Sequence, residues 1–256
     1  MAPKKSEPDK SMNQSLLTCF TKHRCPGWRC PSCHSTSLAI LPETFHSAAV
    51  PESVARYQEA EGGLEDIVLV FSCLLKCERA CCGAVVAVSG TGEIQPAHDE
   101  DEEEDGNPYF SLFQAKSYIP ALSVFDIPQR CPATVAETLR QSFALFPGAP
   151  GAAANTIRIA LEQLMDALGV QAMRSLHHRI EALEAPYAEH KEALMAIKFL
   201  GNAGSHEVDR VAPLDIEHAF FITEFVLRKL YEGSTQSVRQ LVKRLTDLYA
   251  PDAREG

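Results

Sequence analysis

Four cysteines in two short clusters carry the clearest chemistry in this sequence. The first cluster is Cys30-Pro-Ser-Cys33, in which two intervening residues let both sulfurs face one ion at about 2.3 Å, as tetrahedral zinc requires. The second cluster contains Cys77 and Cys82, and the glycine after Cys82 helps backbone amides to point at its sulfur. We therefore predict a four-thiolate Zn²⁺ site of Cys30, Cys33, Cys77 and Cys82. Four protein ligands leave no open position, so the ion is predicted to be structural.

Other side chains near these clusters leave the choice of ligands partly open. Cys81 is a near-equal alternative to Cys82, and three further alternatives are Cys25, His23 and His34. Redox chemistry by the first pair is a separate hypothesis, but the strand–helix context of thioredoxin-like proteins is missing. The cysteines that are not ligands are expected to be small buried apolar residues: Cys19, Cys73 and Cys81.

The distribution of cysteines and the lack of targeting segments indicate a compartment. Eight of the nine cysteines lie within the first 82 residues, and this local enrichment favours metal binding over disulfides. No stretch reaches the roughly 18 consecutive apolar residues of a membrane span. The first 15 residues are polar and lack the apolar run of a secretory signal. We expect a cytoplasmic protein with reduced thiols and no membrane partner.

A small basic and aromatic patch precedes the first cysteine pair. It is formed by Lys22, His23, Arg24, Trp28 and Arg29, and we single out Arg24, Trp28 and Arg29 as candidate nucleic-acid contacts. The alternative is that Trp28 stabilises the fold. The net charge of −10 gives the chain as a whole no basic footprint for sequence-independent binding. Any binding to RNA or DNA would therefore need a local patch or a basic partner.

The elements that must position the cysteines are strands. Apolar, β-branched residues run over 67–75 and again over 84–88, and the second cysteine cluster lies in the turn 77–83 between them. This pattern predicts an α+β chain that starts with a small antiparallel sheet, a zinc ribbon, over residues 16–98. Residues 1–15 are expected to be a disordered tail. Residues 99–131 are expected to be an acidic loop and linker, because seven consecutive acids occupy 99–105.

Over residues 132–250 the apolar period becomes that of a helix, which predicts an all-α domain. The fifth helix, around 220–230, is apolar nearly all round and is expected to be central. The sixth helix, 235–249, has a clean amphipathic pattern that ends before Pro251. The apolar stripes of the other four helices run over 135–146, 157–168, 176–183 and 194–200.

Four segments of this helical region carry motifs in a recognisable order: Ala152–Gly169 with Arg158 and Glu162, Leu176–Leu183, Leu200–His206 and Leu214–Ala219. Over about residues 132–232 they resemble the HEPN-like family called domain of unknown function 4145. The upstream cysteine clusters resemble a zinc ribbon often seen before this domain. The resemblance implies a helical bundle that pairs two copies of the chain. It also implies a protein partner in a bacterial phage-defence or restriction system.

Many HEPN proteins are metal-independent ribonucleases with an Arg, four to six residues and then a His. Here Asn202 and His206 are present, but Gly201 stands at the position of the Arg. The guanidinium that would hold phosphate is therefore missing. The resemblance implies a non-catalytic interaction module, with an endoribonuclease using His206 and Asn202 or a nucleic-acid-binding ribbon as alternatives. Arg158 and Glu162 are further candidate site residues, or an ordinary i,i+4 salt bridge.

Overall fold

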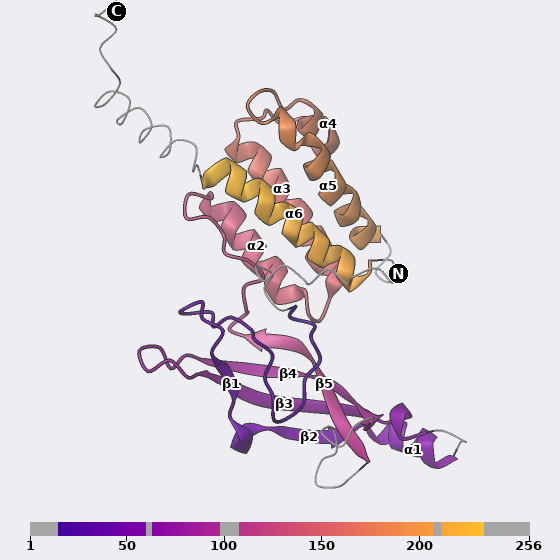
Figure 1. Ribbon diagram of the computed structural model, residues 1–256. Helices are drawn as coiled ribbons and strands as arrows, with labels where there is room; N and C mark the ends of the chain where they lie inside the picture. The colour runs from indigo at the N-terminus through magenta and orange to yellow at the C-terminus, as the bar shows by residue number, and fades with distance from the viewer. Residues whose placement is uncertain (1–14, 60–62, 98–107, 207–210, 233–256) are drawn as a thin grey trace, which may run out of the picture.

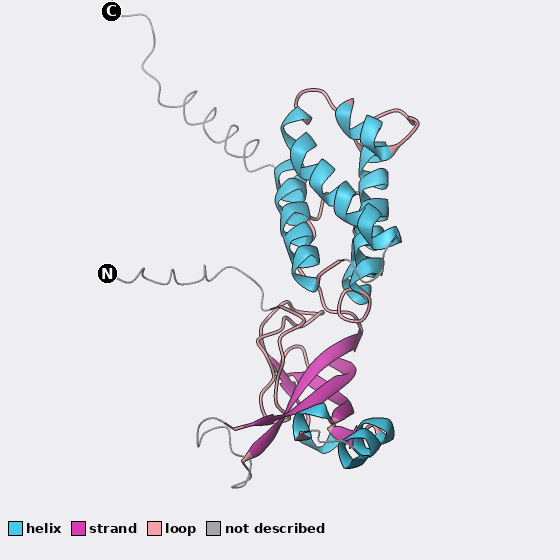
Figure 2. Cartoon of the chain, turned by 90° about the vertical axis from the view of Figure 1, so that its right-hand side faces the viewer, coloured by secondary structure: helices cyan, strands magenta, loops and turns pink. Residues whose placement is uncertain are grey.

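The computed structural model describes residues 15–59, 63–97, 108–206 and 211–232. Figures 1 and 2 show an elongated molecule in which an antiparallel sheet is followed by a separate layer of helices. The first 14 residues, the acidic run 99–105 and the predicted sixth helix lie outside the described residues. Within the described ranges, the structure contains no helix long and apolar enough to cross a membrane.

The first part of the chain forms a curled, five-stranded sheet in which every pairing is antiparallel. Its strands have the spatial order β1-β3-β4-β5, and β2 pairs with β3 beside β1. Helix α1 (Pro51–Glu59) lies between β2 and β3 in the chain. The strands are β1 (Leu38–Ile40), β2 (His46–Ala49), β3 (Val68–Cys77), β4 (Val85–Pro96) and β5 (Tyr109–Ile119).

The sheet is a half-barrel, so the prediction of a small zinc ribbon over residues 16–98 was wrong. It continues to residue 119, because β5 occupies the middle of the predicted linker 99–131. Strand β5 pairs with β4 along its length, with a register shift at Ser89/Gly90. A Cβ on Gly90 would lie 2.1 Å from the Gln114 carbonyl oxygen, so only glycine allows this approach. The shift and the close approach allow the long strands to curl.

The second part of the chain is helical, as predicted, and the described helices follow the predicted apolar stripes. Helix α2 ends before Pro147-Gly148, whereas α5 continues through Gly201 and Gly204, where the sequence predicted its end. The helices are α2 (Ala133–Leu145), α3 (Pro150–Ala167), α4 (Leu176–Glu181), α5 (Lys191–His206) and α6 (Pro213–Tyr231). Helix α3 packs against both α2 and α5 and is therefore the central element of the described helices.

Helix α6 differs from the prediction of a central, fully buried helix. One side of it is buried and includes Ile216, Phe220 and Leu227. The opposite side leaves Phe221 and Phe225 exposed. A helix with apolar residues on every side is expected to be buried on every side. Among the described residues, only one side of α6 is covered.

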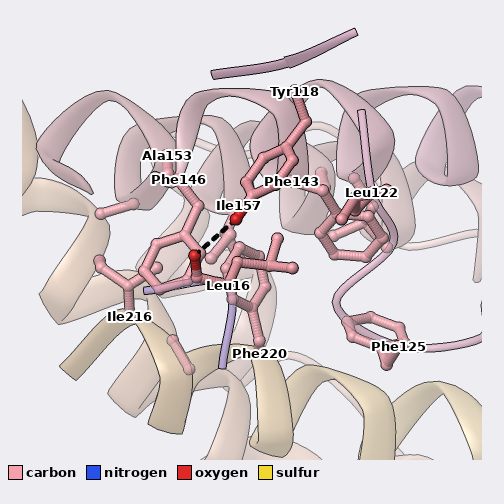
Figure 3. Packing of buried hydrophobic residues seen from close by; sticks show 14 of the residues in the cluster. Leu16, Tyr118, Leu122, Phe125, Phe143, Phe146, Ala153, Ile157, Ile216 and Phe220 are labelled. Atoms are coloured by element: carbon pink, nitrogen blue, oxygen red, sulfur yellow. Dashed lines mark hydrogen bonds between the residues drawn. The ribbon is translucent and has the colours of Figure 1, made fainter. Parts of the chain in front are cut away.

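A shared apolar core joins the sheet to the helices (Figure 3). Tyr118 at the end of β5 donates a hydrogen bond of 2.8 Å to the Leu16 carbonyl oxygen. Phe125, Phe143 and Phe220 stack edge-to-face or tilted, with centroids 5.0 to 6.5 Å apart. The segment after β5 thus packs the two parts together, and the N-terminal segment is inserted at their junction.

Candidate metal centre

The structure brings the four predicted ligands together at one end of the sheet. The sulfurs of Cys30, Cys33, Cys77 and Cys82 all lie within 4.8 Å of one another. The Cys30–Cys82 and Cys33–Cys77 sulfur pairs are 3.7 and 3.6 Å apart. Tetrahedral zinc with four thiolates at about 2.3 Å requires sulfur separations of about 3.8 Å. The cluster can therefore hold one metal ion.

The first cysteine pair lies in a tight turn closed by backbone hydrogen bonds. The Cys30 amide donates to the Ser35 carbonyl oxygen at 2.8 Å, and the His34 amide donates to the Cys30 carbonyl oxygen at 2.9 Å. His34 follows Cys33 directly and has a φ of 57°. This left-handed conformation reverses the chain directly after the pair, where Ser35 returns to accept the hydrogen bond from Cys30.

The second pair spans the turn between β3 and β4. Cys77 is the last residue of β3, and its amide donates to the Ala84 carbonyl oxygen at 2.8 Å. The amides of Cys82 and Gly83 both donate to the Arg79 carbonyl oxygen. Gly83 has a φ of 63°, so each cysteine pair is followed by one left-handed residue. The two turns therefore approach the cluster with similar backbone shapes.

Two serines that were not predicted from the sequence lie beside two of the sulfurs. The Ser35 hydroxyl oxygen lies 3.1 Å from the Cys33 sulfur, and the Ser37 hydroxyl oxygen lies 3.2 Å from the Cys77 sulfur. A hydroxyl that donates to a sulfur favours the thiolate. The Ser35 hydrogen bond lowers the pKa of Cys33 to about 6, and the Ser37 hydrogen bond lowers the pKa of Cys77. The only signal in the sequence that could have identified these serines is their short distance along the chain from Cys33, two and four residues.

The alternative ligands lie outside this cluster. The His34 ring faces Asp126, with Nδ1 3.4 Å from its carboxylate, and His23 is exposed. Burial raises the pKa of Cys25 to about 12 and that of Cys73 to about 11, as expected for neutral thiols. The expectation of burial holds for Cys73 and is wrong for two exposed cysteines, Cys19 and Cys81.

The basic and aromatic patch does not form a base-stacking surface. Trp28 is only 1% exposed and packs edge-to-face on Phe20 and Tyr118. Arg29 donates to the Asp126 carboxylate at 2.7 Å, while Arg24 is exposed. A buried indole cannot stack on a nucleobase. The structural interpretation of Trp28 therefore holds, and the proposed contact by Trp28 was wrong.

The helical candidate residues lie on α3 and α5. Arg158 and Glu162 form an i,i+4 ion pair of 2.5 Å on one helix. Asn202 is half-buried, and His206 is the last residue of α5, with its side chain outside the described part of the chain. Arg158 also donates to the Asn155 side-chain oxygen at 3.2 Å. These contacts fit a surface salt bridge that links two turns of α3.

Gly201 lies where α5 packs closely on α3. A Cβ on Gly201 would lie 2.5 Å from the Arg158 Cβ and 3.0 Å from the Ala154 carbonyl oxygen. A Cβ on Gly204 would similarly meet the Gly151 carbonyl oxygen at 2.5 Å. The position at which the sequence resemblance places an Arg is therefore filled by helix packing in this chain, and it has no room for a longer side chain.

We expect Gly201→Ala to lower the free energy of unfolding by about 1–3 kcal/mol, because the new methyl group overlaps the backbone and Cβ of α3. The greater helix propensity of alanine, about 1 kcal/mol, acts in the opposite direction. Urea unfolding followed by circular dichroism measures the difference. Asn202→Ala is the control on the same helix turn and should change the value by no more than about 0.5 kcal/mol. A neutral or stabilising Gly201→Ala would contradict the packing argument.

The chain is similar to two families without an established function. No curated protein and no solved structure gave a significant match. Residues 18–118, which contain the cysteine cluster and almost the whole sheet, match the model of a domain of unknown function (DUF8608). Residues 140–248 match the model of a domain of unknown function (DUF4145), past residue 232, where the resemblance ended in the sequence. The protein therefore joins a DUF8608-like sheet with a cysteine cluster to a DUF4145-like helical region.

Proposed function

We propose that this protein is a non-catalytic interaction module whose sheet is stabilised by one Zn²⁺ ion. Its HEPN-like helical region would form a homodimer and bind a protein partner in a bacterial phage-defence or restriction system. The structural role of the ion is supported by its ligands, because four thiolates fill a tetrahedral site and leave no position for substrate. Two serine hydroxyls beside the sulfurs add a supporting shell typical of protein metal sites.

The packing of Gly201 is the observation that carries the non-catalytic assignment. Metal-independent RNA cleavage needs a cation beside the phosphate to stabilise the charge that develops on it. In this chain the expected position of that cation faces the backbone of α3 at a distance that excludes a side chain. The nearest guanidinium, that of Arg158, is already paired with Glu162. Position 201 therefore supplies no cation, and the Arg158 guanidinium is engaged elsewhere, whereas the endoribonuclease alternative requires a cation beside the phosphate.

Two measurements on the purified chain test this proposal. Incubation with single-stranded and structured RNAs should give no cleavage above buffer alone. Light scattering after gel filtration should give twice the chain mass of 28.1 kDa at micromolar concentration. A monomer would contradict the homodimer. RNA cleavage that disappears in His206→Ala and persists in the control His178→Ala, an exposed histidine, would replace the proposal with the endoribonuclease.

A further inference from the structure

The exposed side of α6 carries apolar side chains along most of its length. Leu214, Phe221 and Phe225 are 59, 62 and 51% exposed, and His218 between them is exposed as well. Successive spacings of four, three and four residues put these four residues on one side of the helix, and we call them the α6 outer face. Helix α6 crosses in front of α3 in Figure 1, at the surface of the helical region. Exposed apolar side chains gathered in this way, with charges around them, mark an interaction surface.

One flank of the α6 outer face has an acid at one end and a base at the other. Asp215 lies in the first turn of α6 and Lys229 in the last, two heptads apart and therefore on the same flank. Lys229 stands over the Phe225 ring at 5.7 Å, and within the described ranges neither of the two charges forms an ion pair. The helix macrodipole favours this placement of charge in any helix, so the charges identify a partner only together with the apolar side chains between them.

The other flank carries charges that already have partners within the chain. Arg228 pairs with Glu224 at 2.8 Å and lies 3.7 Å from the Glu232 carboxylate. Glu217 accepts a hydrogen bond from the Ser15 hydroxyl. The charges of α6 that are left for a binding partner are therefore those of the first flank, one acid and one base.

We propose that the α6 outer face binds the same face of a second copy of this chain, with the two helices antiparallel. The inference rests on the homodimer of the proposed function and assigns the surface that forms it. Ile222 lies midway between Asp215 and Lys229. In a two-fold pair centred on Ile222, Asp215 therefore meets the partner's Lys229, and Lys229 meets the partner's Asp215. A parallel pair would instead bring like charges together, which is unfavourable.

The same arrangement covers the whole α6 outer face. Phe221 and Phe225 lie within three residues of the two-fold centre, where the rings of the two copies pack together. His218 lies at the level of the partner's Phe225. Leu214 lies at the level of the partner's Lys229 and packs on its aliphatic stem. The pair thus has aromatic side chains at its centre and charges at its rim, as protein interfaces usually do.

Analytical ultracentrifugation of the full chain, which gives the dissociation constant of the dimer, tests the proposal. Phe221→Asp should raise this constant at least about 100-fold, because it puts a charge at the centre of the interface. The matched control is Phe199→Asp, which changes an aromatic residue of α5 that is 55% exposed and lies outside the α6 outer face. The control should leave the constant unchanged. A dimer that resists Phe221→Asp and dissociates in Phe199→Asp would overturn the proposal and assign the interface to α5.

A charge exchange between two exposed residues keeps the test decisive if Phe221→Asp fails to fold. Asp215→Lys and Lys229→Asp each bring like charges together twice in the dimer, so each should raise the dissociation constant at least about tenfold. The double variant Asp215→Lys, Lys229→Asp restores opposite charges and should recover most of the lost affinity. A double variant that dimerises no better than the single variants would overturn the antiparallel pairing. A dimer that none of these variants weakens would refute the α6 interface and leave the homodimer standing, whereas a monomeric wild-type chain would refute both.

Discussion

Replacing Cys33 or Cys77 with serine should release the metal ion and unfold the sheet. Structural zinc contributes an apparent binding free energy of about 10–16 kcal/mol, whereas a whole domain is stable by only about 5–15 kcal/mol. Release of the ion after loss of one of the four thiolates therefore removes a free energy comparable to the whole stability of a domain. Zinc content by elemental analysis should fall from one ion per chain to a small fraction. Thermal unfolding of the sheet should shift below room temperature or disappear.

The controls for this prediction come from cysteines outside the cluster. Cys81→Ser changes the exposed neighbour of Cys82, and Cys19→Ser changes a second exposed thiol. Both variants should retain one zinc ion and the wild-type unfolding temperature. Cobalt added to the metal-free chain should show the intense visible absorption of a tetrahedral thiolate site, and Cys81→Ser should not change it. Loss of metal in Cys81→Ser with retention in Cys82→Ser would show that the ligand choice is wrong.

The second large effect is expected for Trp28→Ala. Truncation of a buried aromatic residue costs about 3–5 kcal/mol, because the packing contacts are lost and a cavity remains. Trp28 packs on Phe20 and Tyr118 with centroids 5.3 and 5.2 Å away, and its Nε1–H donates to the Ser15 carbonyl oxygen at 3.0 Å. We expect a large fall in the urea concentration at the midpoint of unfolding. Unfolding is measured by far-ultraviolet circular dichroism, because the variant has no tryptophan left for fluorescence.

Arg24→Ala separates this structural role from nucleic-acid binding. Arg24 is exposed, and its removal should change stability by no more than about 0.5 kcal/mol. If the patch binds RNA or DNA, Arg24→Ala should weaken that binding in a salt-dependent way. Stability unchanged in Trp28→Ala, together with lost RNA binding, would instead support the nucleic-acid interpretation.

The cysteine cluster was predictable because its signal is local. Two cysteines in one turn face the same side whatever surrounds them, and the second pair was placed by the strands that flank it. The supporting Ser35 and Ser37 were not predictable, because serine is common in turns and its role depends on sulfurs brought from elsewhere in the fold. Similarly, the choice of Cys82 over Cys81 depended on the glycine that follows it, and Gly83 has the left-handed φ that this choice required.

The extent of the sheet was missed because β5 has no apolar run. Its aromatic and aliphatic residues are interrupted by Ser, Gln and Lys, and only Phe113, Ala115 and Tyr118 of this strand are buried. The proximity of the acidic run suggested a linker, whereas pairing with β4 determines the strand. The burial of Trp28 could not be predicted from the sequence either. Trp28 is buried partly by Tyr118, which lies 90 residues later, whereas its neighbours along the chain are basic. The sequence predicted that a helix ends near Gly201. In the structure Gly201 lies inside α5 where this helix packs on α3, and that contact could not be predicted without the position of α3.

The insertion of the N-terminal segment at the junction has a consequence for synthesis on the ribosome. The Ser15 hydroxyl donates to the Glu217 carboxylate, a separation of 202 residues along the chain. Leu16 is buried beside Ile216 and Phe220 of α6 (Figure 3). Ser15 and Leu16 thus acquire their final neighbours only after α6 has left the exit tunnel. They are made well before α6 and reach their native positions only after it, and until then the apolar side chain of Leu16 is accessible to chaperones.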